Sequence, residues 1–332
     1  MKDQRKKLLV VENLKVYYPL RRKSILDKDP GSVKAVDDIS FFVYEGETFG
    51  LVGESGCGKS TTGKALVRLN KPTEGRIIFD GRDLNALSTR EEIMDITRRI
   101  QIIFQDPFSS LDPRFTIGHS IMEPMSVHNI GTKEERRKRT LQLMTDVGLR
   151  EELFTRYPHE FSGGQRQRIG VARALALNPS LIVCDEPVSA LDVSIQAQIL
   201  NLMQQLQKKY NLTYLFISHN LSVVKHVCDR IAVMYLGHIV EIADKKSLFS
   251  SPLHPYTQAL LEAIPVPDPD VPSMTGSLEG DVPSPIDPPA GCCFHTRCKY
   301  ADECCRKKRP ELTEYKEGHY AACHRISAGQ GQ

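Results

Sequence analysis

Short apolar runs, separated by stretches of helical periodicity, recur along most of the chain. The segment Leu8–Tyr18 alternates apolar and polar residues, which predicts an edge strand. Further strands are predicted at Ile39–Tyr44, Thr48–Val52, Arg76–Phe79, Ile100–Phe104, Leu181–Cys184, Thr213–Ile217 and Ile231–Tyr235. Strands that alternate with helices in this way favour an α/β fold, in which helices cover a sheet.

One helix is indicated by a regular apolar stripe. Ile195, Ile199, Leu202, Met203 and Leu206 recur at intervals that place them on one helical face, with Gln and Lys residues outside. The pattern predicts a helix with one buried face.

Two segments interrupt this pattern. Arg21–Lys34 is rich in charged residues and contains a Pro-Gly pair, so we expect a surface loop there. After Leu261 the chain is crowded with prolines, which exclude a regular helix. We therefore predict a Pro-rich linker or extended wrap over residues 263–290, followed by a small Cys-rich unit over residues 291–326.

The composition is that of an ordinary globular protein. The 332 residues suffice for one large domain and a small appendage. With 40% hydrophobic and 26% charged residues and a net charge of +3, the chain is not fibrous, collagen-like or disordered. No apolar run is long enough for a membrane span, and the basic N-terminus leads into too short an apolar run for a secretion signal. The basic run Arg306–Arg309 is interpreted as a solvated face, and no nucleic-acid partner is expected.

A glycine-rich loop, Gly53–Ser60, lies between a predicted strand and a helix that begins near Lys59. Glycines let backbone N–H groups point at phosphate oxygens, and the helix adds its positive N-terminal end. Lys59 is expected to reach the β- and γ-phosphates of a triphosphate, and Ser60 to bind Mg²⁺. The predicted contacts of this loop are Gly53, Ser55, Gly56, Gly58, Lys59, Ser60 and Thr61.

Two adjacent carboxylates end the apolar run Leu181–Cys184. Asp185 and Glu186 would be costly at the end of a buried strand without a cation or another partner. Asp185 is therefore predicted to bind Mg²⁺, and Glu186 to polarise the attacking water. Alone, such a pair is more often a plain helix cap.

A third motif identifies a family. Ser162, Gly163, Gly164 and Gln165, followed by Arg166–Arg168 and then by the two carboxylates, resemble the signature of the ABC ATPases. The resemblance covers about residues 8–262 and implies an ABC-type phosphate-loop ATPase domain over residues 1–262. Such a domain has a RecA-like core, an antiparallel β subdomain and a helical signature subdomain, here at about residues 106–170. The Cys-rich segment would be a small C-terminal extension of it.

The resemblance also assigns roles. Tyr18, or Tyr17, would stack on adenine, Gln105 would sense Mg²⁺ and the transporter, Asp192 would lie in the dimer-contact loop, and His219 would contact the γ-phosphate. The catalytic residues implied are Glu186, His219 and Gln105, and the Mg²⁺ ligands are Ser60, Gln105 and Asp185. ATP would be sandwiched between Lys59, Ser60, Gln105, Asp185, Glu186 and His219 of this chain and the signature of a partner, while this chain's Ser162 and Gly164 serve the partner's ATP. In this family ATP binding closes the dimer and hydrolysis reopens it.

The residues around the motifs indicate a subfamily. The segments Phe104–Arg114, Pro158–Ser162, Asp185–Val193 and Ser251–Thr257 look like those of the oligopeptide and dipeptide importers, with details typical of their F-type subunit. The resemblance implies a heterodimer with a D-type ATPase, two membrane permeases and an extracytoplasmic peptide-binding protein. The chain would then be peripheral at the cytoplasmic face of the cell membrane.

Three alternatives are open. Related importers of nickel or other small solutes are similar in sequence. A soluble ABC ATPase acting on DNA or the ribosome typically has two such domains or a long coiled-coil insertion, and neither is seen here. A non-hydrolysing partner subunit is disfavoured because Glu186 and His219 are both present.

The chain has nine cysteines, and most of them lie close to the C-terminus. The spacing of Cys292, Cys298, Cys305 and Cys323 matches the C-terminal extension of the importer subfamily, whose members can hold a four-iron, four-sulfur (4Fe–4S) cluster. Four thiolates suit such a cluster or a zinc ion, and zinc favours closer pairs, so we expect a cluster first, zinc next and free thiols last. The alternative ligands are Cys293, Cys304, His295, His319 and His324, whereas Cys57, Cys184 and Cys228 are interpreted as small apolar fillers.

Overall fold

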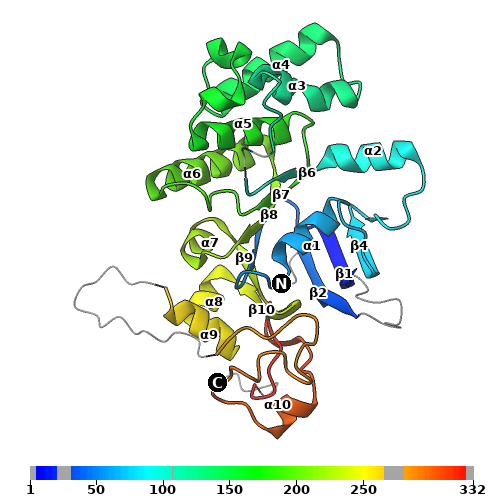
Figure 1. Cartoon of the computed structure of the whole chain (residues 1–332), viewed down its shortest axis with the longest axis vertical. Coiled ribbons are helices and arrows are strands. Elements are labelled where there is room, and N and C mark those ends of the chain that lie inside the picture. The colour runs from blue at the N-terminus through cyan, green and yellow to red at the C-terminus, as the bar shows by residue number, and fades with distance from the viewer. Residues whose placement is uncertain (1–4, 21–30, 107, 109, 265–279, 327–332) are drawn as a thin grey trace, which may run out of the picture. The chain divides into compact units, whose positions relative to one another are not determined.

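The structure is a computed structural model that describes residues 5–20, 31–106, 108, 110–264 and 280–326 (Figure 1). The described residues form two compact units. The first comprises Tyr44–Thr48 and Ala86–Ile217 together with the residues just before Lys7. The second comprises Lys7–Val43, Phe49–Asn85 and the described residues from Ser218 onwards. Most of the predicted loop Arg21–Lys34, and residues 265–279 of the predicted linker, lie outside the described residues.

The first unit contains three parallel strands. β7 (Leu181–Asp185) pairs on one side with β6 (Ile100–Ile103) and on the other with β8 (Thr213–Ser218). Every residue of β7 and β8 is buried, which explains why these strands are continuous apolar runs in the sequence. The three strands predicted in this part of the chain are thereby confirmed.

Helices make up the rest of the first unit. They are α2 (Arg90–Arg99), α3 (Ile117–Val127), α4 (Lys133–Asp146), α5 (Gly163–Leu175) and α6 (Val193–Tyr210), with short 3-10 turns η1 (Glu151–Thr155) and η2 (Pro158–Glu160). The apolar stripe of α6 is buried at Ile199, Leu202, Met203 and Leu206, as predicted. Thr89 and Thr132 begin α2 and α4 with reciprocal capping boxes, which satisfy N–H groups of the first helical turn.

The second unit contains an antiparallel sheet with the strand order β2-β1-β4-β5. Its strands are β1 (Lys7–Pro19), β2 (Ser32–Tyr44), β4 (Glu74–Phe79) and β5 (Arg82–Asp83). The prediction that Leu8–Tyr18 is an edge strand was wrong, because β1 lies between β2 and β4. Alternating apolar and polar residues indicate that one face of a strand is buried and the other is not, but they do not indicate whether the strand lies at the edge of its sheet. The predicted loop also ends too late, since β2 begins at Ser32.

A second group of strands in this unit includes the C-terminal tail. β3 (Thr48–Val52) is parallel to β9 (Arg230–Tyr235), which pairs in antiparallel fashion with β10 (His238–Asp244). β10 pairs with β12 (His319–Ala321), and β12 with β11 (Thr313–Lys316). The tail, coloured orange to red in Figure 1, is thus joined to the unit by main-chain hydrogen bonds.

Five helices are described in the second unit. They are α1 (Lys59–Leu66), α7 (Leu221–Val227), α8 (Lys245–Ser250), α9 (Pro255–Glu262) and α10 (Glu303–Lys307). Residues 280–290, the described end of the predicted linker, contain neither helix nor strand, in agreement with their proline content. Among all described residues, no helix is both long enough and apolar enough to cross a membrane.

Candidate functional site

The phosphate loop leaves β3 and enters α1, in the order that the motif requires. Its tip, Ser55 and Gly56, is exposed, whereas Gly58 is buried. Gly58 has a φ of 104°, and a Cβ there would lie 2.1 Å from the backbone oxygen of Ala35. Only glycine fits this position. Because Gly58 also caps α1 without a side chain, no side chain competes for the first N–H groups of the helix.

Lys59 is buried at the base of the loop. Its Nζ donates to the carbonyl oxygens of Gly53 and Glu54, at 2.8 Å each. A lysine held by loop carbonyls lies close to the place where the loop would receive phosphates. Ser60 and Thr61 follow it at the half-buried start of α1.

The two candidate adenine platforms differ in exposure. Tyr18 is 39% exposed, and its hydroxyl accepts a hydrogen bond from Nδ2 of Asn70 at 2.7 Å. Tyr17 is half-buried, and its hydroxyl donates to the Asp37 carboxylate. Burial and this carboxylate raise the pKa of Tyr17 above its usual value. The ring of Tyr18 is thus the more accessible of the two.

His219 follows β8 directly and is exposed. The next residue, Asn220, caps α7 by accepting hydrogen bonds from the N–H groups of Ser222 and Val223. The hydroxyl of Ser218 accepts the N–H of Asn220 at 3.0 Å. His219 is therefore held in a short turn between a buried strand and a capped helix.

In the first unit, the predicted catalytic acid and the predicted sensor glutamine lie together. Nε2 of Gln105 donates to Oε2 of Glu186 at 3.0 Å. Asp185 is the last residue of buried β7 and is 4% exposed, and Glu186 follows it, half-buried. The N–H of Glu186 donates to the carbonyl of Ile217 at 3.0 Å, which ties the turn to the end of β8.

The signature residues form the start of α5. Ser162 caps the helix, and Ser162 and Gln165 form a reciprocal capping box. A Cβ on Gly164 would lie 2.6 Å from Cγ2 of Ile195, so the start of α5 approaches the start of α6 closely. Asp192 caps α6 without a side-chain hydrogen bond and is exposed, as Ser162 is. The signature and the Asp192 loop are thus neighbours within one unit.

The cysteines of the tail divide into distinct environments. Burial, followed by smaller contributions from the neighbouring thiols of Cys305, Cys323 and Cys298, raises the pKa of Cys292 to about 11. Cys293 instead places its Sγ 3.9 Å from the carbonyl of Tyr235, and Cys304 is exposed. The thiols that act on Cys292 are those of the other three predicted ligands, although burial and then Cys292 raise the pKa of Cys293 as well. No three His, Cys, Asp or Glu side chains of the described residues are grouped tightly enough to hold a single metal ion.

The tail histidines have other partners. Nε2 of His319 lies 2.7 Å from the buried Glu241 carboxylate, and Nε2 of His324 lies 2.7 Å from the carbonyl of Lys308. Nδ1 of His295 lies 2.9 Å from the carbonyl of Cys292. These contacts explain the buried histidine and glutamate without a metal. The three remaining cysteines, Cys57, Cys184 and Cys228, are buried as predicted, although Cys228 follows α7 rather than lying within it.

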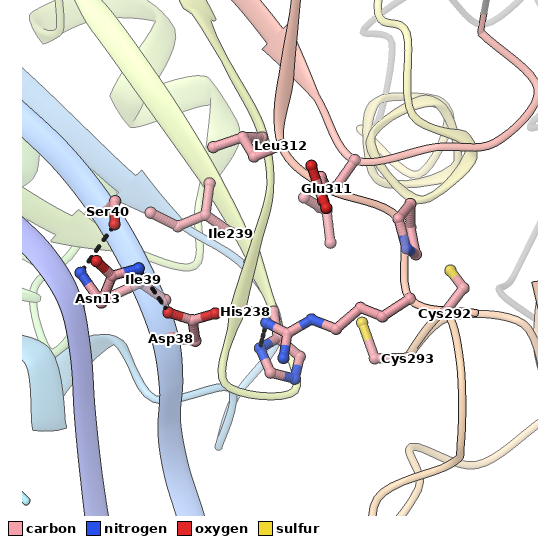
Figure 2. A pocket seen from close by; sticks show the side chains of 14 residues that line it. Asn13, Asp38, Ile39, Ser40, His238, Ile239, Cys292, Cys293, Glu311 and Leu312 are labelled. Carbon is pink, nitrogen blue, oxygen red and sulfur yellow. Dashed lines mark hydrogen bonds between the residues drawn. The ribbon is translucent and has the colours of Figure 1, made fainter. Parts of the chain in front are cut away.

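A cavity of about 450 Å³ lies between β2, β10 and the tail (Figure 2). Its wall includes Asp38, His238, Cys292, Cys293 and Arg309. Arg309, which belongs to the run interpreted as a solvated face, is exposed and also reaches Nδ1 of His238, at 2.6 Å. Burial, and then the charge of Arg309, lower the pKa of His238 to about 4. None of the residues lining this cavity belongs to the predicted nucleotide contacts.

Two contacts of the phosphate loop were missed at the level of sequence. Arg297 of the tail forms an ion pair with Glu54, and the hydroxyl of Tyr256 accepts the N–H of Glu54 at 2.9 Å. Neither residue belongs to a motif, and both are far from Glu54 in the sequence. The only sequence feature near Arg297 is the cysteine that follows it, Cys298, and that feature does not indicate Glu54 as the partner of Arg297.

Two family models match the sequence. The ABC transporter family matches residues 36–189, and the family described as "Oligopeptide/dipeptide transporter, C-terminal region" matches residues 240–305. Among curated proteins, the oligopeptide transport ATP-binding protein AppF of Bacillus subtilis is 52% identical over 327 residues, covering 96% of this chain and 98% of that protein. The oligopeptide transport ATP-binding protein OppF of Salmonella typhimurium is 50% identical over 328 residues, covering 98% of each chain.

Solved structures agree with these relatives. The dimeric ATP-binding cassette MJ0796, in a post-hydrolysis state bound to ADP and Pi, is 30% identical with a TM-score of 0.63, covering 71% of this chain and 98% of that one. The cassette cbiO1 from Clostridium perfringens, part of the ABC transporter complex cbiONQ, is 28% identical with a TM-score of 0.63. It covers 74% of this chain and 91% of that one. The predicted ATPase fold is confirmed.

Proposed function

This chain belongs to the oligopeptide-transport branch of the ABC transporter ATP-binding proteins, and from that premise we propose that it hydrolyses ATP to power the import of oligopeptides or dipeptides. The likeness extends over nearly the full length of relatives that are named oligopeptide transport ATP-binding proteins. It includes the C-terminal region that gives the oligopeptide/dipeptide family its description. That region supports peptides over nickel or another small solute as the cargo.

The pairing of Glu186 with Gln105 carries the hydrolytic part of the proposal. A carboxylate fixed at the end of a buried strand can accept a proton from an attacking water, and a neighbouring amide can orient that water. Oε2 of Glu186 and Nε2 of Gln105 are 3.0 Å apart, so the two groups are already together. A subunit that had lost hydrolysis would not be expected to keep both. The intact pair therefore disfavours a purely structural role.

The remaining nucleotide contacts follow the same assignment. The loop N–H groups and Lys59 bind the phosphates, His219 contacts the γ-phosphate, and Tyr18 stacks on adenine. Ser60, Gln105 and Asp185 are the proposed Mg²⁺ ligands, and they offer the hydroxyl, amide and carboxylate oxygens that Mg²⁺ accepts. When bound, Mg²⁺ neutralises charge that develops on the β- and γ-phosphates.

The signature is proposed to serve the ATP of a second ATPase subunit. Ser162 is exposed at the N-terminus of α5, whose N–H groups and dipole favour an anion. Asp192, in the neighbouring loop, would contact the same partner. A related cassette is dimeric in its solved structure, which supports this arrangement. We propose a D-type paralogue as the partner in a heterodimer.

The complex would also contain two membrane permeases and an extracytoplasmic peptide-binding protein. This chain would then be bound peripherally at the cytoplasmic face of the membrane. Pull-down from mild detergent tests this assembly against that of a non-transport ABC ATPase. Recovery of permeases with the second ATPase supports the importer, whereas recovery of DNA-repair or ribosomal proteins alone contradicts it.

The substitution Glu186→Gln tests hydrolysis in the assembled transporter. ATP turnover is expected to fall by about 10²–10⁴-fold, the usual contribution of a general base, while ATP binding persists. The matched control is Glu134→Gln, which removes an exposed carboxylate from α4 in the same unit. Turnover that is unchanged in Glu186→Gln would refute the assignment.

For the tail, we propose that Cys292, Cys298, Cys305 and Cys323 hold a four-iron, four-sulfur cluster. Support comes from the matched spacing and from the effect of the Cys305, Cys323 and Cys298 thiols on Cys292. Several thiolates cannot ionise close together without a cation, and a cluster provides one. A cluster also spreads its ligands over several metal atoms, whereas a single zinc ion needs all four sulfurs within about 2.3 Å of it.

Iron and sulfide analysis with a visible spectrum of anaerobically purified protein tests the cluster. Cys298→Ser is expected to lose most of the iron and the colour, whereas Cys304→Ser, at an exposed thiol, is expected to keep both. Zinc in place of iron, or a colourless wild-type protein with full activity, would contradict the proposal.

A further inference from the structure

The C-terminal tail holds the phosphate loop through an ion pair. Nη1 of Arg297 donates to Oε2 of Glu54 at 2.7 Å, and Nη2 donates to Oε1 at 3.2 Å. The pair is bidentate and charge-assisted, the strongest class of side-chain hydrogen bond. The Arg297 side chain is only 5% exposed and that of Glu54 26%, so solvent screens the pair incompletely. This distinguishes it from ordinary surface ion pairs of the chain.

The backbone of Glu54 is fixed as well. Its N–H donates to the hydroxyl of Tyr256 at 2.9 Å, and its carbonyl accepts from Nζ of Lys59 at 2.8 Å. Glu54 thus connects the lysine that is proposed to bind phosphate with α9 and with the tail. A shift of the Glu54 side chain would therefore move the carbonyl oxygen that holds Nζ of Lys59.

Arg297 is itself fixed by the turn that contains the first two proposed cluster ligands. Within this turn the N–H of His295 donates to the carbonyl of Cys292, and that of Arg297 to the carbonyl of Phe294, both at 3.0 Å. Arg297 directly precedes Cys298. The conformation of the turn from Cys292 to Cys298 therefore sets where the guanidinium lies.

A buried aromatic cluster joins the same turn to the loop. The ring of Phe294 packs against those of Tyr235 and Tyr256, with centroid distances of 5.2 and 5.3 Å. Tyr235 and Tyr256 are 4.7 Å apart, and Tyr256 is the residue that accepts the N–H of Glu54. Since interiors are close-packed, a displacement of the turn cannot be absorbed within this cluster without moving its members.

Because Glu54 is charged, its ion pair with Arg297 affects how the phosphate loop binds a nucleotide. A carboxylate in a loop that receives a triphosphate repels it, and like charges placed together weaken binding at recognition surfaces. Arg297 cancels this charge and draws the carboxylate towards the tail. Without the arginine, the loop would keep an unpaired, half-buried negative charge.

We propose that Arg297 is a positioning residue through which the C-terminal tail controls the affinity of the phosphate loop for ATP. It holds Glu54 and cancels its charge, and it does so only while the turn from Cys292 to Cys298 keeps its conformation. The inference rests on the proposed function of the loop as the ATP site, and it gives that site a means of regulation.

The test measures ATP binding and turnover by the assembled transporter, with a fluorescent ATP analogue as the binding probe. Arg297→Gln is expected to weaken analogue binding and raise the KM for ATP by about tenfold or more, the scale on which truncation of a partly buried charge pair acts. The kcat is expected to stay within about twofold, because no group that touches the reacting atoms has changed. Arg297→Lys keeps the positive charge but not the two-pronged guanidinium, so its KM for ATP should lie between those of wild type and Arg297→Gln.

The double variant Glu54→Gln/Arg297→Gln separates this role from a merely structural one. Removal of the carboxylate should return the KM to within about threefold of wild type, since coupled residues compensate one another. If the arginine served only to fold the tail, the double variant would be no better than Arg297→Gln, and that result would overturn the proposal. An unchanged KM in Arg297→Gln would do the same.

Two further variants complete the experiment. Lys299→Gln removes an exposed positive charge two residues away and is expected to behave as wild type. Lys59→Met is expected to abolish analogue binding. If Lys59→Met binds the analogue normally, the proposed ATP site itself is wrong, whereas loss of binding there with no effect in Arg297→Gln rejects only the coupling to the tail.

Discussion

The backbone at Glu186 is left-handed, with a φ of 47°, although the residue is not glycine. Such a conformation costs of order 1–3 kcal/mol and persists only where the surroundings enforce it. Here the N–H of Glu186 is held by the carbonyl of Ile217, and its carbonyl accepts the hydroxyl of Ser189 at 3.1 Å. The turn after β7 therefore stores strain at the residue proposed to activate water.

Gly58 offers a residue-scale prediction. Gly58→Ala would place a Cβ against the backbone oxygen of Ala35, which cannot move aside as a side chain can. The loop must shift, so affinity for ATP is expected to fall by roughly a hundredfold or more, the scale set by a backbone change of a few kcal/mol at a strained position. Equilibrium binding of a fluorescent ATP analogue measures it.

The control for this variant is Gly81→Ala, in the turn between β4 and β5. Gly81 also has a positive φ, of 79°, but a Cβ there meets nothing within 4 Å. This change is expected to lower stability by about 1–2 kcal/mol and to leave ATP affinity unchanged. Equal loss of ATP affinity in both variants would contradict the steric explanation.

At the scale of residues, the sequence indicated the reactive groups but not all of the contacts that hold them in place. Asp185 and Glu186 could be identified because two adjacent acids after a buried strand are costly unless a cation or another partner compensates them. The structure adds that Gln105, a site residue that only the family resemblance suggested, contacts Glu186. The pair of Glu54 with Arg297 was missed, because its members are 243 positions apart and local patterns carry no information about such a contact.

At the scale of elements, α9 begins at a buried histidine. Nδ1 of His254 accepts the N–H of Tyr256 at 3.1 Å, as a helix cap does, so this nitrogen carries no proton. Burial lowers the pKa of His254 to about 4, and the nearby Glu241 carboxylate opposes the shift only partly. Protonation would remove the cap and bury a charge.

The pH dependence of stability follows from this shift. The folded-state pKa lies below the unfolded value of about 6.5, so the stabilisation is complete above that pH and declines as the pH falls towards about 4. Between pH 7.5 and pH 5 the loss attributable to His254 is expected to be about 2 kcal/mol. Urea unfolding at the two pH values measures it.

His254→Asn is the matched variant, because asparagine keeps a cap acceptor and does not titrate. It is expected to be less stable than wild type at pH 7.5, owing to lost packing, but to show a smaller decline at pH 5. His238, whose pKa is also lowered, is present in both proteins and does not affect the difference. An identical decline in both would show that His254 does not titrate as described.

Elements were predictable where one face or both faces are apolar. β7 and β8 were found because their residues are buried throughout. β10 was missed, since Glu241 interrupts its apolar run, and a buried charge is tolerable only with partners. Those partners are the N–H groups of Leu253 and His254, which directly precede α9, and the ring of His319 in the tail. No sequence pattern could have identified them.

At the scale of the whole molecule, the tail belongs to the second unit rather than hanging from it. β12 pairs with β10, His319 meets Glu241, and Arg297 meets Glu54. The Cys-rich spacing predicted a metal site, but not that the residues between the cysteines reach the phosphate loop. The tail is thus placed to act on the phosphate loop whether or not it holds a metal.

ATP hydrolysis on this chain is proposed to drive peptide import. Its most direct test is uptake of a labelled oligopeptide by vesicles that contain the permeases, both ATPase subunits and the binding protein. Wild-type vesicles are expected to accumulate peptide only with Mg²⁺ and ATP, and vesicles with Glu186→Gln to accumulate no more than those without ATP. Uptake that is unaffected by Glu186→Gln, or ATP hydrolysis without any peptide accumulation, would contradict the account.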